Sequence, residues 1–379
     1  MKLSVLTLRP NNITRVLWHL LFYLAVCYNF HRYIFKYSHG AFAKEGYQQT
    51  PLIWQLGKYI LVIMILSLIY FNSRFSRRLP VSLLLFYAFI GIVLAINIIS
   101  AVLYHEVMTD ELEYVVFALT VLPLGLISKD DLKVLATEID KILNVSQYIF
   151  IISNWIVIFN YFVFRIVPFH AYEGILLRFG GLWDDPNTFA IVSVLLMGYA
   201  LTKKQYVLVT LHAINTLFTI SLNGYLLLIA FVFYFVLNNK KRRVLYICLF
   251  ILLTIFISVL VVYNINYAVQ IYEAKRESIE QHTTFSQISL FPIPLLQPLQ
   301  FHETWLLSEN INYFPFSLPF TIAITLLFVY FFLFKPPSIQ RLMFILFFIT
   351  SLFLPFLYMF PVNFIALLFL VLYTKGVQF

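Results

Sequence analysis

The chain has 379 residues, of which 61% are apolar, 19% are aromatic and only 11% are charged. A soluble domain carries about a quarter charged residues, so this composition excludes cytosolic enzymes, nucleic-acid-binding modules and disordered tails. The mean hydropathy of +0.87 indicates a membrane protein, in which the net charge of +9 reports orientation first. Cys27 and Cys248 lie inside apolar runs, which favours core thiols over a disulfide or a metal site.

Twelve apolar runs without Asp or Glu are candidates for transmembrane helices, since about 20 residues cross roughly 30 Å of hydrocarbon. They predict an all-α polytopic protein that forms one integral membrane domain over residues 1–379. The two short runs around Ser221 to Asn223 also fit a tight hairpin or a re-entrant segment. In chain order the runs are approximately Val16 to Phe35, Leu52 to Phe71, Val81 to Tyr104, Tyr114 to Ser128, Val145 to Val167, Thr188 to Thr202, Tyr206 to Ile220, Gly224 to Leu237, Val244 to Ile265, Leu318 to Phe334, Leu342 to Tyr358 and Asn363 to Tyr373.

The loops between these runs alternate in charge. Most of the 26 basic residues fall in alternate loops, for example Lys240 to Arg243, whereas most of the 17 acidic residues fall in the other loops. By the positive-inside rule, both termini are cytoplasmic. The first run is long, lacks a cleavage site and is followed by more spans, so we expect a transmembrane helix there and not a signal peptide.

Two outer segments, 168–187 and 267–317, are the expected carriers of chemistry. The first reads PFHAYEGILLRFGGLWDDPN, and the second joins the ninth and tenth runs. A loop as long as the second is typically functional in a compact protein. Its apolar, proline-broken part, Ile288 to Phe301, is expected either to lie on or dip into the membrane surface or to form a cover without chemistry.

Arg178 stands out in the first segment because it lies on the face where basic residues are scarce. Gly180 and Gly181 follow it and permit close approach of the backbone to a ligand. A guanidinium suits bidentate phosphate binding. Arg165 before it and Arg276 in the second segment either extend an anion site or anchor the chain at the interface.

The end of the first segment has a structural interpretation. Asp185 or Asn187 is placed to cap the next helix, and Pro186 suits its first turn. Trp183 in the same segment is either a stacking surface for substrate or an interfacial anchor.

His302 and Glu303 are the candidate acid–base residues of the second segment. An imidazole beside a carboxylate can act as a general base with an orienting partner. A histidine in an outer loop is also commonly just solvated.

The sequence RFGGLWDDPNTFA resembles the Arg-x-x-Gly…Asp-Pro-Asn…Ala signature of the O-antigen polymerase and O-antigen ligase family, the Wzy-like membrane glycosyltransferases. The order of parts is similar as well: the motif, two short spans around SLNG, another span, and a large outer loop with HETW near its end. Related proteins often have an arginine in the SLNG-like turn. Its absence here leaves phosphate binding to Arg178 and the long loop.

The resemblance implies polymerisation of polyprenyl-pyrophosphate-linked oligosaccharide repeat units into O-antigen, capsule or exopolysaccharide. The reaction would occur at the outer face of the bacterial cytoplasmic membrane, without cofactor or metal. Arg178, with Arg276 and Arg165 as weaker candidates, would hold the pyrophosphate leaving group. His302, or Glu303, would take the acceptor proton. The chain-length regulator and the flippase of the same pathway are expected partners.

Three alternatives stay open. Transfer of a finished glycan by an O-antigen ligase uses the same donor chemistry. Twelve spans also suit a lipid-linked oligosaccharide flippase, although the runs hold few ionisable residues, chiefly His19, Lys58 and His212, which favours an enzyme over an ion-driven carrier. A structural or sensory membrane protein would leave the basic outer motif unexplained.

Overall fold

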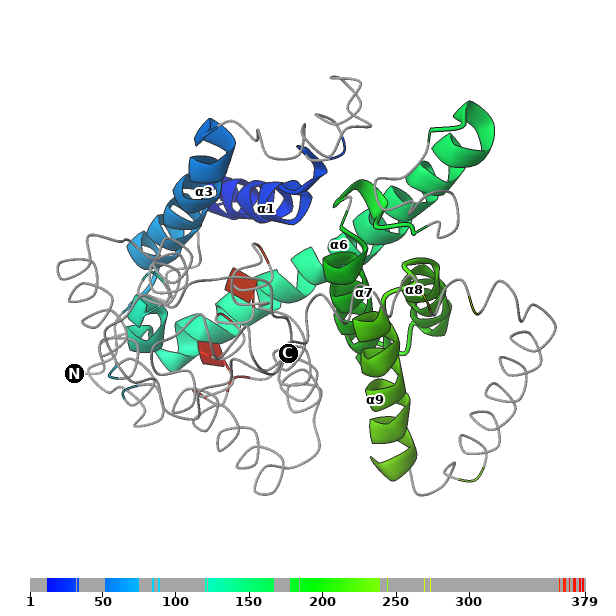
Figure 1. Ribbon diagram of the computed structural model, residues 1–379. Coiled ribbons are helices and arrows are strands. Elements are labelled where there is room, and N and C mark those ends of the chain that lie inside the picture. The colour runs from blue at the N-terminus through cyan, green and yellow to red at the C-terminus, as the bar shows by residue number, and fades with distance from the viewer. Residues whose placement is uncertain are drawn as a thin grey trace, which may run out of the picture. The chain divides into compact units, whose positions relative to one another are not determined.

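A computed structural model of the protein describes the chain in segments, drawn as coloured ribbons in Figure 1. Within these segments the regular elements are helices and no β-strand occurs, so the all-α prediction is confirmed for them. The chain divides into two compact units: Met1–Ala95, Leu112–Ser146 and Tyr358–Phe379 in the first, and Ile96–Glu111 and Gln147–Leu357 in the second. The described residues are 12–31, 33, 52–74, 84, 88, 120, 122–166, 178–183, 185–238, 244, 269, 273, 361, 364, 365, 368, 371, 372, 375 and 377.

The first unit contains α1 (Asn12–Cys27) and α3 (Leu52–Phe71), which pack against each other. Trp18, Phe22 and Ala25 recur at helical spacing on α1 and are buried in the core of this unit. Apolar residues of α1 such as Leu20 and Leu24 stay exposed. The helix is therefore apolar on more than the face that its packing requires.

The longest element is α6 (Lys129–Phe164), 36 residues that begin in the first unit and end in the second. At about 1.5 Å per residue it is roughly 54 Å long. It is the one described helix that is long and apolar enough to cross a membrane. Ser128 caps it, because its hydroxyl oxygen accepts from the Asp131 backbone N–H at 3.2 Å.

The second unit adds three helices after α6. They are α7 (Pro186–Thr202), α8 (Tyr206–Phe218) and α9 (Leu222–Asn238), preceded by the short 3-10 helix η3 (Gly181–Trp183). Figure 1 shows α7 beside both α8 and α9, and contacts join it to each of them. Most of α7 is buried, as expected for a helix that is apolar all round.

The predicted runs locate most of these helices closely. α3 has the predicted bounds, and α7, α8 and α9 begin and end within two residues of them. The prediction differs at α1, which begins four residues before Val16 and ends eight residues before Phe35. It differs most at α6, which begins sixteen residues before Val145. Residues 129–144 are charged but amphipathic, with a buried face that includes Leu132, Leu135 and Ile139. Helical spacing on that face extends the helix through a segment that a count of charges assigns to a loop.

Candidate functional site

Arg178 lies in the second unit against the turn that joins α8 to α9. Its side chain is buried, with the residue 3% exposed. Nε donates to the Thr219 carbonyl at 2.9 Å, and Nη2 donates to Asn187 Oδ1 at 2.7 Å. Both acceptors are uncharged oxygens, so these two bonds orient the guanidinium without neutralising its charge. The backbone next to Arg178 also contacts the end of α8, since the Phe179 N–H donates to the Phe218 carbonyl at 3.1 Å.

Asn187 connects this arginine to the α8–α9 turn. Its Oδ1 also accepts from the Ser221 hydroxyl at 2.8 Å. The Gly224 N–H in turn donates to Ser221 Oγ at 3.3 Å, and Ile220 in the turn has φ of 46°. One amide oxygen thus joins the Arg178 loop to the SLNG turn.

Asp185 is the N-cap of α7, with Pro186 in the first turn. The Asp185 carboxylate accepts from the Asn187 backbone N–H at 3.0 Å and from the Thr188 hydroxyl. The cap therefore fixes the backbone of Asn187, and the Asn187 side chain is left to meet Arg178 and Ser221.

Gly180 and Gly181 have tight surroundings. A Cβ at Gly180 would lie 2.7 Å from the Pro186 nitrogen, and one at Gly181 would lie 2.5 Å from the Phe189 ring. Gly181 also has φ of 58°, a left-handed conformation that favours glycine. In this structure the close approach that the glycines permit is to the first residues of α7.

Trp183 packs into the protein. It is 1% exposed, and its ring meets Phe150 of α6 edge-on at 4.9 Å between centroids. Phe150 stacks in turn on Phe189 of α7, at 5.4 Å. Both interpretations from the sequence, a substrate platform and an interfacial anchor, are wrong for this residue, because the aromatic cluster holds η3 between α6 and α7.

The remaining predicted site residues are not brought to Arg178 by any described contact. Arg165 follows α6, is exposed and has φ of 55°. Arg276, His302 and Glu303 lie outside the described residues, as does most of the long outer segment.

A second group of polar side chains lies inside the α6–α7–α8 bundle, where sequence reasoning singled out only His212. Asn154 Nδ2 donates to Asn215 Oδ1 at 3.0 Å, and both residues are fully buried. Asn154 Oδ1, Asn215 Nδ2, Ser193 Oγ and both ring nitrogens of His212 are buried without a hydrogen-bond partner among the described residues.

Helical spacing places these side chains on faces that meet. Ile151, Ala200 and Leu208 form one apolar cluster of α6, α7 and α8. Asn154 is three residues from Ile151, and His212 is four residues from Leu208, which puts each on the same face as its neighbour. A sequence signal was present in each case: a polar residue at helical spacing from apolar ones in an apolar run.

The first unit has a buried carboxylate of its own. Glu138 of α6 is 4% exposed at its side chain, and it accepts from Lys141 Nζ at 2.9 Å and from His19 Nε2 at 2.8 Å. Arg15 Nε lies 3.9 Å away. Burial raises the pKa of Glu138, but these hydrogen bonds and charges outweigh burial and hold the pKa below its usual value.

No protein-family model, curated protein or solved structure matches this chain. Among the described residues no group of His, Cys, Asp and Glu has an arrangement that could hold a metal ion. The Arg178 site presents an oriented guanidinium, a shared amide oxygen and a hydroxyl. Such a set binds anionic or hydroxyl-bearing ligands.

Proposed function

We propose that the protein is a membrane glycosyltransferase that polymerises polyprenyl-pyrophosphate-linked oligosaccharide repeat units into a surface polysaccharide. One observation carries the proposal: Asn187 Oδ1 accepts from both Arg178 and Ser221. The RFGGLWDDPN patch, which resembles the O-antigen polymerase and ligase family, thereby meets the SLNG turn at one atom. That turn has the family's place in the order of parts but lacks the arginine that related proteins often carry there. Patches that are distant in sequence and adjacent in space are expected of one functional site.

The membrane placement is part of the proposal: twelve transmembrane helices in the bacterial cytoplasmic membrane, with both termini cytoplasmic. The length and apolarity of α6 support it. So does the short connection between α7 and α8, which carries Lys203 and Lys204 and suits a cytoplasmic turn. The N-terminal end of α7 and the C-terminal end of α8 then both face outward, with Arg178 between them.

In the proposed mechanism, Arg178 binds the pyrophosphate of the donor. As the glycosidic carbon–oxygen bond breaks, the leaving pyrophosphate gains negative charge, which a guanidinium stabilises. Because Arg178 is buried and holds Asn187, a pyrophosphate oxygen replaces the Asn187 oxygen as acceptor when the donor binds. The acceptor hydroxyl loses its proton to His302 or Glu303 while its oxygen attacks the sugar carbon.

The test is complementation of a deletion strain, with the surface polysaccharide resolved by length on a gel. Deletion is expected to leave single repeat units, and wild type to restore the ladder. Arg178→Ala is expected to restore no ladder. Because it also removes two buried hydrogen bonds, the amount of protein in the membrane is measured alongside. Lys133→Ala removes an exposed basic residue of α6 and is the matched control, expected to behave as wild type.

Asn187→Asp separates a structural role of Arg178 from phosphate binding. The substituted oxygen still accepts from Arg178 and Ser221, so the loop keeps its contacts, but the new carboxylate neutralises the guanidinium. A folded protein without polymerisation supports the proposal. Full ladders from both Arg178→Ala and Asn187→Asp would overturn it, and long polymer that stays unattached would indicate a ligase.

A lipid-linked oligosaccharide carrier is the second candidate, favoured by the buried polar atoms of Asn154, Ser193, His212 and Asn215 within the helix bundle. Carriers place polar pathway residues inside the helix bundle, near the midplane of the membrane. A carrier predicts that deletion reduces the amount of polymer while leaving the repeat units on the cytoplasmic side of the membrane. The polymerase predicts single repeat units at the cell surface.

A further inference from the structure

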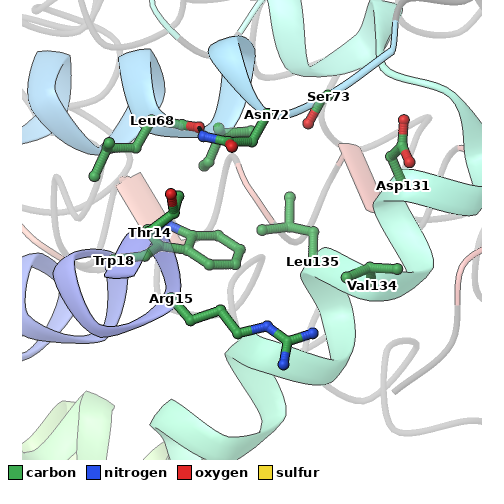
Figure 2. A pocket seen from close by; sticks show the side chains of 10 residues that line it. Thr14, Arg15, Trp18, Leu68, Asn72, Ser73, Asp131, Val134 and Leu135 are labelled. Atoms are coloured by element: carbon green, nitrogen blue, oxygen red, sulfur yellow. Dashed lines mark hydrogen bonds between the residues drawn. The ribbon is translucent and has the colours of Figure 1, made fainter. Parts of the chain in front are cut away.

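A cavity of about 50 Å³ lies in the first unit between α1, the end of α3 and the first turns of α6. Figure 2 shows Arg15 and Trp18 on the α1 side, Asp131 on the α6 side, and Asn72 from the end of α3. One basic and one acidic residue, Arg15 and Asp131, therefore line the same cavity from different helices.

On the α1 side of the cavity, Trp18 and Arg15 each have a buried N–H donor, and Arg15 also carries a positive charge. Trp18 is 7% exposed, and its Nε1–H meets no acceptor among the described residues. The buried Nε of Arg15, three residues earlier, also makes no described hydrogen bond and lies 3.9 Å from Glu138. Lys141 and His19 approach that carboxylate more closely, at 2.9 and 2.8 Å. Because buried N–H groups cost free energy until they meet acceptors, these donors favour an acceptor-rich anion such as a phosphate diester.

Asp131 supplies the opposite sign. Its Oδ2 accepts from the Arg74 backbone N–H at 2.7 Å and from the Ser128 hydroxyl at 2.9 Å. Both donors are uncharged, so they hold the carboxylate in place without neutralising it. The α6 side of the cavity is therefore suited to a cationic group of the same ligand.

The position of the cavity fits a lipid headgroup. In the proposed topology Arg15 begins the first span and Asn72 follows the second, which puts the cavity at the cytoplasmic membrane surface, where basic pockets between helices bind headgroups. From that level Val16, Leu20 and Leu24 are exposed along α1 and offer a surface to acyl chains. A phosphate and a primary ammonium are the two charges of one zwitterionic headgroup.

We propose that this cavity binds the headgroup of phosphatidylethanolamine, with the phosphate at Arg15 and Trp18 and the ammonium at Asp131. The inference rests on the proposed membrane placement but not on glycosyl transfer. Lipid binding and polymer length are separate readouts, so the two proposals can fail separately.

Native mass spectrometry of the purified full-length protein tests the site, with phosphatidylethanolamine, phosphatidylglycerol and phosphatidylcholine of the same acyl chains as probes. Phosphatidylethanolamine is expected to bind most tightly. Phosphatidylglycerol has the phosphate but no ammonium, and the quaternary ammonium of phosphatidylcholine has no N–H to donate to Asp131.

Two variants separate the two charges. Arg15→Gln is expected to weaken binding of all three lipids by about tenfold, the value of one charge-assisted contact. Asp131→Asn is expected to abolish the preference for phosphatidylethanolamine over phosphatidylglycerol. Lys133→Gln and Asp130→Asn make the same charge changes at exposed positions of α6, and they should bind as wild type does.

Trp18→Phe keeps the ring and removes only the N–H, so it tests the phosphate contact if Arg15→Gln fails to fold. It is expected to weaken binding of every phospholipid. Equal binding of the three lipids by wild type, or wild-type preference in Asp131→Asn, would overturn the proposal. Phosphoethanolamine that competes as well as the lipid does would also overturn it, because the site would then recognise a soluble molecule.

Discussion

Arg178 Nη2 donates to Asn187 Oδ1 at 2.7 Å, so the arginine of the motif is joined to the asparagine that ends it. The same guanidinium reaches the Thr219 carbonyl from Nε. A planar group with several donors makes both bonds at once. Replacing the guanidinium by a group with a single donor nitrogen therefore breaks at least one of them.

Arg178→Lys should destabilise the protein although it keeps the charge. A lysine ammonium lacks the planar fork and cannot replace both bonds in their observed directions. We expect a loss of about 1–3 kcal/mol, the cost of leaving a buried acceptor unmet. Thermal unfolding of the purified protein measures it, with Lys133→Arg on the exposed face of α6 as the control. An unchanged melting temperature would contradict the structural role of these bonds.

Asp185→Ala should remove the N-cap of α7. The carboxylate accepts from the Asn187 N–H and the Thr188 hydroxyl. Its loss leaves both donors without this acceptor, so the free energy of unfolding is expected to fall by about 1 kcal/mol. Asp185→Asn, which keeps an accepting oxygen, should lose less. Denaturant unfolding of the two variants provides the comparison, and equal losses would show that charge, not capping, is what matters here.

The same substitution should have opposite effects at two glycines. Gly181→Ala is strained, because φ is 58° and the new Cβ would meet the Phe189 ring, so about 1–3 kcal/mol should be lost. Gly57 lies within α3, where a Cβ would lie 3.1 Å from the Tyr28 hydroxyl, the far end of a flexible side chain. There Gly57→Ala should be neutral or stabilising by up to about 1 kcal/mol. Melting temperatures of the two variants test this prediction. A higher melting temperature for Gly181→Ala would contradict the described backbone conformation at Gly181.

The Asn154–Asn215 hydrogen bond should appear as coupling in a double-mutant cycle. Asn154→Leu or Asn215→Leu alone leaves a buried amide without its partner, whereas the double variant pairs two apolar side chains. We expect each single variant to lose more stability than the double one, with coupling of about 1 kcal/mol. Additive losses would mean that the two amides do not interact.

Stability should depend on pH through Glu138. Its pKa is lower in the folded protein than the usual value of 4.5, so the unfolded chain binds the proton more readily. The stabilisation is therefore complete above about pH 4.5 and is lost as pH falls through the lowered folded pKa. Glu138→Gln should flatten this part of the profile. Melting temperatures between about pH 3 and 6 test it, and a wild-type slope in Glu138→Gln would assign the effect to other carboxylates.

Much of the helical layout follows from the sequence, for identifiable reasons. Long apolar runs located α3, α7, α8 and α9 because composition alone marks a helix that is buried or lipid-facing on every side. The cap of α7 was also predictable, since Asp185 and Pro186 act locally. The charged start of α6 was missed because its apolar positions had to be read with helical spacing and not by counting charges.

The contacts of the candidate site were beyond the sequence. Nothing local pairs Arg178 with the Thr219 carbonyl, because a backbone acceptor has no sequence signature. Trp183 looked like a surface residue, and only the packing of Phe150 from another helix buries it. Tertiary neighbours decide whether a polar or aromatic side chain faces substrate or protein, and the sequence does not list them.

The sharing of Asn187 Oδ1 also orders the steps of biogenesis. Arg178 and Asn187 are nine residues apart and can meet as soon as the first turn of α7 forms. Ser221 is 34 residues beyond Asn187, and Thr219 is 41 beyond Arg178. In a nascent chain that ends after α7, Arg178 can therefore donate to Asn187 but not yet to the Thr219 carbonyl. The loop reaches its final shape only after the ribosome has made α8 and the turn that follows it.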